Sequence, residues 1–247
     1  MIGPLRAELL KQRSTQTVLA LLAGMVALVG LAIALHVLTP AAAELATRSD
    51  QLPSFEVGTR VGMLFAALVG ALAITGEFRY GTIRPTFHVT PRRTPVITAK
   101  LVVSALTGLI FGLVATGLMA GAVSVALAAR GIGNQLTGSD YLRLLAGGMV
   151  AAALWATIGV GIGALIRNQV STLVGICAWL LLVEHLIPSD VARYTPGNAG
   201  LALAIQATHT QLAPSVSTLA VGALALPLYA AAASAVGWRA TLGRDAV

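Results

Sequence analysis

Long stretches without charge are the feature that most restricts how this chain folds. Six segments carry at most one charged residue each and are 18 to 29 residues long. About 20 apolar residues in a helix cross the roughly 30 Å hydrocarbon core of a bilayer. The sequence therefore predicts six transmembrane spans. They cover approximately residues 17–38, 57–75, 101–129, 144–166, 170–187 and 216–238.

The spans are predicted to be helices, because only helices and closed barrels satisfy backbone polar groups in lipid. A barrel requires strands of about ten residues with alternating polarity. These segments are longer and apolar on all sides. Composition agrees, since 57% of residues are hydrophobic and only 10% are charged, against about 25% charged in soluble domains. We expect an all-α integral membrane protein whose residues 1–247 form one transmembrane domain.

The basic residues orient the predicted bundle. Cytoplasmic loops of membrane proteins are enriched in Lys and Arg, so the net charge of +7 does not require a nucleic-acid partner. With the N-terminus inside, eleven basic residues lie inside and five outside, which predicts two cytoplasmic termini. The inner set is Arg6, Lys11, Arg13, Arg79, Arg84, Arg92, Arg93, Lys100, Arg167, Arg239 and Arg244, and the outer set is Arg48, Arg60, Arg130, Arg143 and Arg193.

Three shorter features accompany the spans. Residues 5–11 (LRAELLK) predict a short interfacial helix on the cytoplasmic face, with a frayed basic tail as the alternative. Residues 188–215 predict an outer loop that returns to the membrane interface as one or two short helices. Glycines four residues apart predict close helix packing inside the bundle. These pairs are Gly108 and Gly112, Gly117 and Gly121, and Gly159 and Gly163.

Catalytic motifs are missing from the sequence. Lys11 follows Leu10 and Lys100 follows Ala99, so neither lysine ends the Gly-Lys-Ser/Thr motif of a phosphate-binding loop. No His or Cys cluster has metal-ligand spacing, and the single Cys177 cannot form an internal disulfide. Near the end of the fifth span, the adjacent Glu184 and His185 are interpreted as a snorkelling pair at the interface, with a functional pair as the weaker alternative.

One basic segment lies between the second and third predicted spans. Residues 76–100, GEFRYGTIRPTFHVTPRRTPVITAK, hold five of the sixteen Lys and Arg residues. A basic segment with Gly and Pro between two spans is typical of a cytoplasmic loop. We call residues 76–100 the basic segment.

The order of residues in the basic segment resembles the cytoplasmic loop of type-2 ABC exporter permeases. The shared pattern is an acid, then Gly-Thr, then Pro-Arg-Arg, then Ala-Lys at the start of the next span. Weaker similarities are AELLKQRSTQTVLALL near the N-terminus, RYTPGNAGLAL before the sixth span and the terminal GWRATLGRDAV. Two departures are Pro85 with the sequence TFHVT, which shortens any helix there, and the absence of Trp from the basic end of the loop.

The resemblance implies a two-fold permease dimer that binds two cytoplasmic ATPase subunits in a bacterial cell membrane. ATP and Mg²⁺ would then be bound by the partner ATPase, and no cofactor by this chain. A coupling helix between spans two and three would contact the ATPase. The matching positions are Glu77, Arg79, Gly81, Thr82, Pro91, Arg92, Arg93 and Lys100.

The residues leave several alternatives open. Arg92, Arg93 and Lys100 would alternatively anchor to anionic lipid headgroups, at about 1 kcal/mol each. The chain as a whole would alternatively be an ATPase-binding immunity or sensor protein, a membrane enzyme or a passive channel. Apolar spans suit a hydrophobic or amphipathic substrate such as a drug, lipid or peptide. The sequence does not identify that substrate, the residues that line its path, or whether two permease copies are identical.

Overall fold

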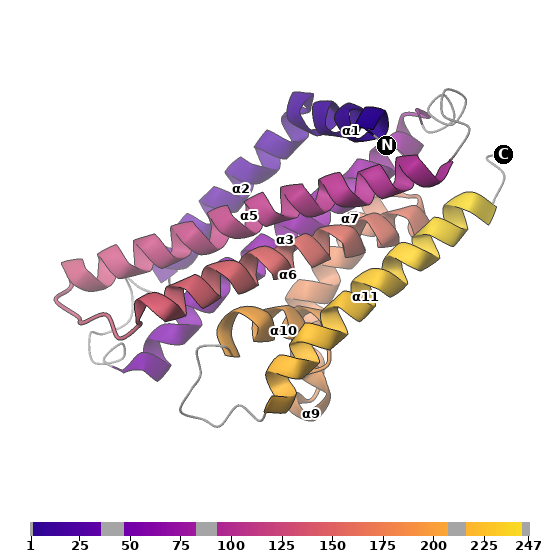
Figure 1. Cartoon of the computed structure of the whole chain (residues 1–247). Coiled ribbons are helices and arrows are strands. Elements are labelled where there is room, and N and C mark those ends of the chain that lie inside the picture. Colours follow the sequence, from indigo (N-terminus) through magenta and orange to yellow (C-terminus); the bar gives the residue numbers. More distant parts are fainter. Residues whose placement is uncertain (1, 36–46, 83–92, 207–215, 244–247) are drawn as a thin grey trace.

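The described part of the chain is a bundle of long helices. The computed structural model describes residues 2–35, 47–82, 93–206 and 216–243, and all regular secondary structure in these ranges is helical (Figure 1). The elements are α1 (Ile2–Ser14), α2 (Gln16–Ile33), α3 (Arg48–Arg79), α5 (Arg93–Ala129), α6 (Gly138–Ile166), α7 (Gln169–Ala178), η3 (Trp179–Val183), α8 (Glu184–Leu186), α9 (Ser189–Ala192), α10 (Pro196–Leu201), η4 (Ala202–Gln206) and α11 (Val216–Gly243).

Five helical stretches within the described residues are long and apolar enough to cross a membrane. They are Gln16–Ile33, Gln51–Arg79, Thr94–Ala129, Gly138–Ile166 and Gln169–Leu186. Each contains most of one of the first five predicted spans. The all-helical fold is therefore confirmed for the described residues, and five of its helical stretches are suited to cross a membrane. The sixth predicted span lies within the 28-residue helix α11. The count of six spans stays a prediction.

Both ends of the described chain lie at the same end of the bundle (Figure 1). Helix α1, the last turn of α3, the first turns of α5, the junction of α6 with α7 and the last turn of α11 meet there. We call this the terminal end. The described ends of the predicted cytoplasmic segments therefore lie at one end of the bundle, as the predicted six crossings would require. Which side of a membrane this end faces remains a prediction from the charges.

Helices α3, α5 and α6 pack closely through glycines. A Cβ atom on Gly108 would lie 2.7 Å from the carbonyl oxygen of Ala152, and one on Gly159 would lie 2.1 Å from that of Ala67. Any side chain at these positions would separate the helices. The predicted close packing is therefore confirmed for the pairs that contain Gly108 and Gly159. The prediction is wrong for the pair Gly117 and Gly121, because a Cβ on Gly121 would meet no atom within 4 Å.

The segment after the fifth apolar stretch turns back into the bundle. Helices α9 and α10 and the π-helical turn η4 follow one another between residues 189 and 206. Gly197, Gly200 and Leu201 of α10 are buried. A Cβ atom on Gly200 would lie 2.3 Å from the sulfur of Met63 on α3. The predicted short helices are confirmed for these residues, and residues 207–215 lie outside the described part.

Candidate functional site: a charge cluster at the terminal end

Two residues at the two ends of the basic segment meet in the structure. Glu77 lies near the end of α3, and Lys100 lies in the second turn of α5. The Lys100 Nζ atom is 3.2 Å from the Glu77 Oε1 atom. Glu77 is only 8% exposed and Lys100 only 2%. The basic segment is therefore closed at its base by an ion pair that is shielded from solvent.

Helix α1 adds an acid and a base to this pair. Glu8 accepts a hydrogen bond from the Lys100 Nζ atom at 2.9 Å. Lys11 donates to Glu77 at 2.7 Å and to Glu8 at 3.0 Å. Two carboxylates and two ammonium groups thus form one connected set with no net charge. We call Glu8, Lys11, Glu77 and Lys100 the four-charge cluster.

The cluster compensates the cost of burying its charges. An unpaired buried charge is strongly unfavourable, and a buried pair is tolerated when hydrogen bonds satisfy its remaining donors and acceptors. The Lys100 ammonium also donates to the carbonyl oxygen of Ala73 at 2.8 Å, so all three of its donors have acceptors within reach. Thr107 on α5 also hydrogen-bonds to Gln12 on α1. Helix α1 is thereby joined to both α3 and α5.

The ion pairs of the cluster shift the pKa values of its two α1 residues, Glu8 and Lys11. Burial acts to raise the pKa of Glu8, but the nearby Lys100 and Lys11 outweigh it and hold that pKa below the usual value of 4.5. Burial acts to lower the pKa of Lys11, but its hydrogen bonds to Glu77 and Glu8 raise it above 10.5. At neutral pH the two α1 residues are therefore charged, and both contribute to the attraction within the cluster.

Lys100 is not placed to bind lipid headgroups. A lysine that anchors to the membrane surface extends its ammonium group toward water and phosphate. The Lys100 side chain is instead 2% exposed, and its Nζ atom points to Glu8, Glu77 and Ala73. The alternative role of Lys100 as a lipid anchor is therefore wrong. Glu77 and Lys100 are placed to position the basic segment.

The residues that follow Glu77 form an exposed tip. Arg79 donates to the side-chain oxygen of Gln169 at 3.2 Å and lies over the ring of Tyr80, 5.6 Å from its centroid. Gly81 has a φ of +67°, a left-handed conformation that glycine adopts without strain. Thr82 is also exposed.

The side chains of three predicted site residues are not described in the structure. Pro91 and Arg92 lie outside the described residues. Arg93 begins α5, and only its backbone is described. The coupling helix was predicted between spans two and three, and residues 83–92 of that region also lie outside the described part.

A cavity of about 540 Å³ lies beside the four-charge cluster. Glu8, Lys11 and Glu77 line one part of it, and Leu21, Val69 and Leu72 line another. The cavity therefore combines charged and apolar walls at the terminal end of the bundle.

Sequence reasoning did not find the role of α1. Glu8 was grouped with the polar face of a surface helix, but it is 4% exposed and turned toward the bundle. Leu9 and Leu10 are 46% and 66% exposed instead. A usable signal was present, because the only two lysines of the chain, Lys11 and Lys100, are both in the cluster.

The interpretation of Glu184 as a snorkelling residue is wrong. Glu184 is 3% exposed, and its Oε1 atom accepts hydrogen bonds from the Trp179 indole at 2.8 Å and from the Gly197 amide at 2.7 Å. The neighbouring His185 is exposed. The returning segment places Gly197 against this carboxylate, which a reading of the fifth span alone does not foresee.

The described residues define a helical protein with stretches suited to cross a membrane and a charge cluster at one end. Among them, no three or more His, Cys, Asp and Glu side chains are grouped as metal ligands would be. Comparison with protein-family models and with curated proteins finds no match to this chain.

Proposed function

We propose that this chain is the membrane-spanning permease subunit of an ATP-driven ABC exporter. The observation that carries the proposal is the ion pair of Glu77 and Lys100, which closes the base of the basic segment. The pair joins the end of α3 to the start of α5, and Glu8 joins both to α1. A force applied to the basic segment would therefore act directly on three helices of the bundle.

Such a force would come from a cytoplasmic ATPase. The resemblance of the basic segment to the coupling loop of type-2 ABC permeases supports this partner, and a two-fold permease dimer with two ATPase subunits is part of the same proposal. ATP and Mg²⁺ would be held by the ATPase. The exposed Arg79 at the tip supplies a guanidinium for an acidic group on the partner. The transported molecule would be hydrophobic or amphipathic and would leave the cytoplasm.

Only the exposed site residues would touch the ATPase, and the buried ones would pass its movement on to the helices. Glu77 and Lys100 are buried, so they would hold the basic segment in register while exposed residues touch the ATPase. We therefore expect two classes of variants. Loss of Arg79 would weaken the complex, and loss of the Glu77–Lys100 pair would leave the complex intact but uncouple ATP hydrolysis from transport.

The test is purification of the tagged chain from its native membrane in mild detergent, followed by mass measurement of the intact complex. We expect two permease copies with two ATPase subunits. Inverted vesicles that contain the complex should accumulate substrate only with ATP. A chain that transports or hydrolyses ATP alone would contradict the proposal. An ATPase complex that moves no substrate would instead favour the immunity or sensor role, and flux without ATP would favour a channel.

A matched pair of arginines separates coupling from general surface effects. Arg79 and Arg193 are both exposed, and each lies over the next tyrosine, at 5.6 and 4.8 Å from the ring centroid. Arg79 ends α3 at the terminal end, and Arg193 directly follows α9, which lies toward the other end of the bundle (Figure 1). Arg79→Ala should lower the yield of the ATPase complex, because a charge-assisted contact contributes roughly 1.5–3 kcal/mol. Arg193→Ala should leave it unchanged. Equal yields from both variants would refute the assignment of the tip.

A further inference from the structure

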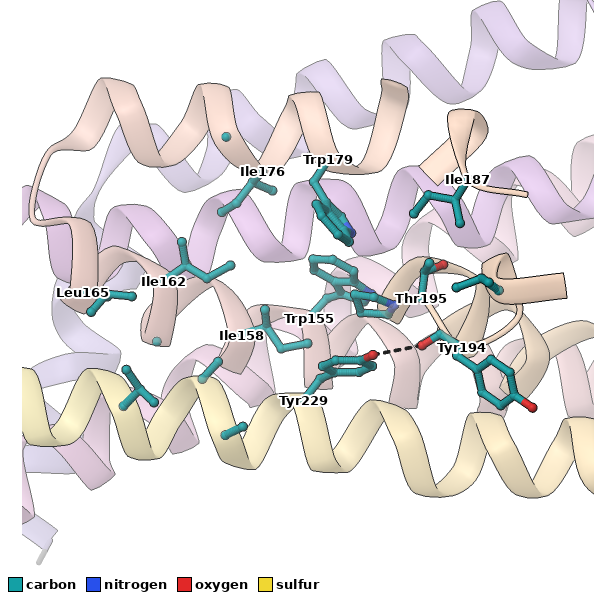
Figure 2. A pocket seen from close by; sticks show the side chains of 17 residues that line it. Trp155, Ile158, Ile162, Leu165, Ile176, Trp179, Ile187, Tyr194, Thr195 and Tyr229 are labelled. Atoms are coloured by element: carbon teal, nitrogen blue, oxygen red, sulfur yellow. Dashed lines mark hydrogen bonds between the residues drawn. The ribbon is translucent and has the colours of Figure 1, made fainter. Parts of the chain in front are cut away.

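A groove of about 750 Å³ runs along the side of the bundle and shares no lining residue with the cavity beside the four-charge cluster. It lies between α6, the α7–η3 helix and α11, with α9 and α10 at one end. Figure 2 shows Trp155, Trp179 and Tyr229 near its middle, with Leu165 toward one end and Tyr194 toward the other. None of the described residues that line it is charged.

The groove is open to the surroundings of the bundle. Leu165 and Val236 in its wall are 48% and 47% exposed, and Trp179 is 37% exposed. These helices belong to a chain with five helical stretches long and apolar enough to cross a membrane. The medium at such a surface consists of lipid chains, and an apolar space of this kind does not hold water stably.

The part of the groove between Trp155 and its Leu165 end matches one leaflet in length. Trp155 and Leu165 lie ten residues apart on α6, which corresponds to about 15 Å along the helix axis. This is half of the roughly 30 Å hydrocarbon core. Because α6 ends at Ile166, the Leu165 end of the groove lies at the terminal end of the bundle. The wall between these positions includes Ile158 and Ile162 and is aliphatic.

A positive charge lies beyond the Leu165 end of the groove. Val236 lines the groove, and Arg239 is three residues further along α11, on the same face of the helix. Arg239 is exposed. The aliphatic part of the groove, about one leaflet long, thus ends one helical turn from a guanidinium. Guanidinium groups bind phosphate through charge-assisted hydrogen bonds.

We propose that the groove holds an acyl chain of a phospholipid from the leaflet at the terminal end, with the lipid phosphate at Arg239. The chain would extend from Leu165 toward Trp155. The aromatic side chains near the middle would limit how far it reaches. This lipid site does not depend on the proposed transport function, since it follows from the groove, its depth and its charged end.

Gly175 provides a way to fill the groove. It lines the wall on α7, and a Cβ atom built on it would meet no atom within 4 Å. Gly175→Leu should therefore place a side chain in the groove without displacing a helix. Gly121 on α5 has the same open space around its Cβ position but does not line the groove. Gly121→Leu is the matched control.

The experiment uses the purified full chain in phosphatidylcholine vesicles that contain phosphatidylglycerol with a photoreactive diazirine in its acyl chain. Labelled residues are mapped by mass spectrometry after irradiation. We expect labels concentrated on α6, α7 and α11 residues of the groove, and competition by unlabelled phosphatidylglycerol. Gly175→Leu should reduce groove labelling to the level of the outer face of α5. Gly121→Leu should leave it unchanged.

The headgroup contact is tested in the same vesicles. Arg239→Gln should reduce groove labelling about fivefold, the loss expected for one arginine at a charged membrane surface. Arg6→Gln removes an exposed charge from α1 at the same end and should have no effect. Equal labelling of the groove and of α5, or no loss in Gly175→Leu or in Arg239→Gln, would overturn the proposal. A change in oligomeric state in Gly175→Leu without a change in labelling would also overturn it, since a second copy would then cover the groove.

Discussion

Replacement of the buried lysine of the four-charge cluster should destabilise the protein far more than replacement of the exposed one. Lys100→Met removes a cation that lies 2.9 Å from Glu8 and 3.2 Å from Glu77. The two carboxylates would then share Lys11 alone. Removal of one partner from a buried ion pair costs about 3–5 kcal/mol. We expect a loss in this range in the free energy of unfolding.

The other lysine is the control. Lys11→Met is the same chemical change in the same cluster, but the Lys11 side chain is 48% exposed. The buried Lys100 would still pair with both carboxylates, and the Lys11 ammonium that is removed is already partly solvated, so the expected cost is about 0–1 kcal/mol. Both variants are compared with the wild type by equilibrium unfolding in mixed detergent and lipid micelles at neutral pH.

A second substitution tests whether charge imbalance is the cause. Adding Glu8→Gln to Lys100→Met leaves Glu77 paired with Lys11 and restores a net charge of zero. The double variant should recover about 0.5–3 kcal/mol relative to the sum of the single effects, as is typical for residues in one ion-pair network. If Lys100→Met costs no more than Lys11→Met, or if the two substitutions are additive, the cluster is not a desolvated network and the reasoning is refuted.

Three further predictions concern topology, pH and packing. In a Cys177→Ser background, a membrane-impermeant thiol reagent applied to intact cells should label Gly133→Cys and spare Tyr80→Cys, and the reverse pattern would overturn the predicted orientation. Because the pKa of Glu8 is lowered in the fold, its stabilising contribution should be complete above pH 4.5 and be lost as pH falls through the lower folded-state pKa. Glu8→Gln should therefore flatten the acid limb of an unfolding titration, and an unchanged limb would exclude this residue as its source. Gly197→Ala should cost roughly 1–3 kcal/mol of unfolding free energy, because the new Cβ would lie 2.0 Å from the carboxylate packed against it, and wild-type stability in this variant would show that the contact relaxes without cost.

The length of the apolar segments made the helices predictable. Segments such as residues 101–129 and 144–166 are too long and too apolar to fold as anything but buried or membrane-crossing helices. The structure places α5 and α6 over them. Helix boundaries were less predictable, because polar residues at helix ends do not lower hydropathy in a defined place. Helix α3 thus begins at Arg48, although its predicted span begins at residue 57.

The surroundings of individual polar residues were not predictable in the same way. Glu8, Glu184 and Lys100 look alike in sequence, each a charged residue near the end of an apolar stretch. The structure buries all three, and each has a hydrogen-bond partner on a different element. No local pattern encodes a contact between residues 92 positions apart, such as Lys100 with Glu8.

Sequence alone determined that this chain forms apolar helices with a basic segment between two of them, because local hydropathy and charge decide what each segment can do in lipid or water. The tertiary structure decided which charges are buried together at the terminal end and where the side groove opens. These depend on how the helices cross, and glycines such as Gly108 and Gly159 set that crossing by allowing backbones to touch. Burial of a charge is favourable only where its partner arrives, and helix packing brings that partner.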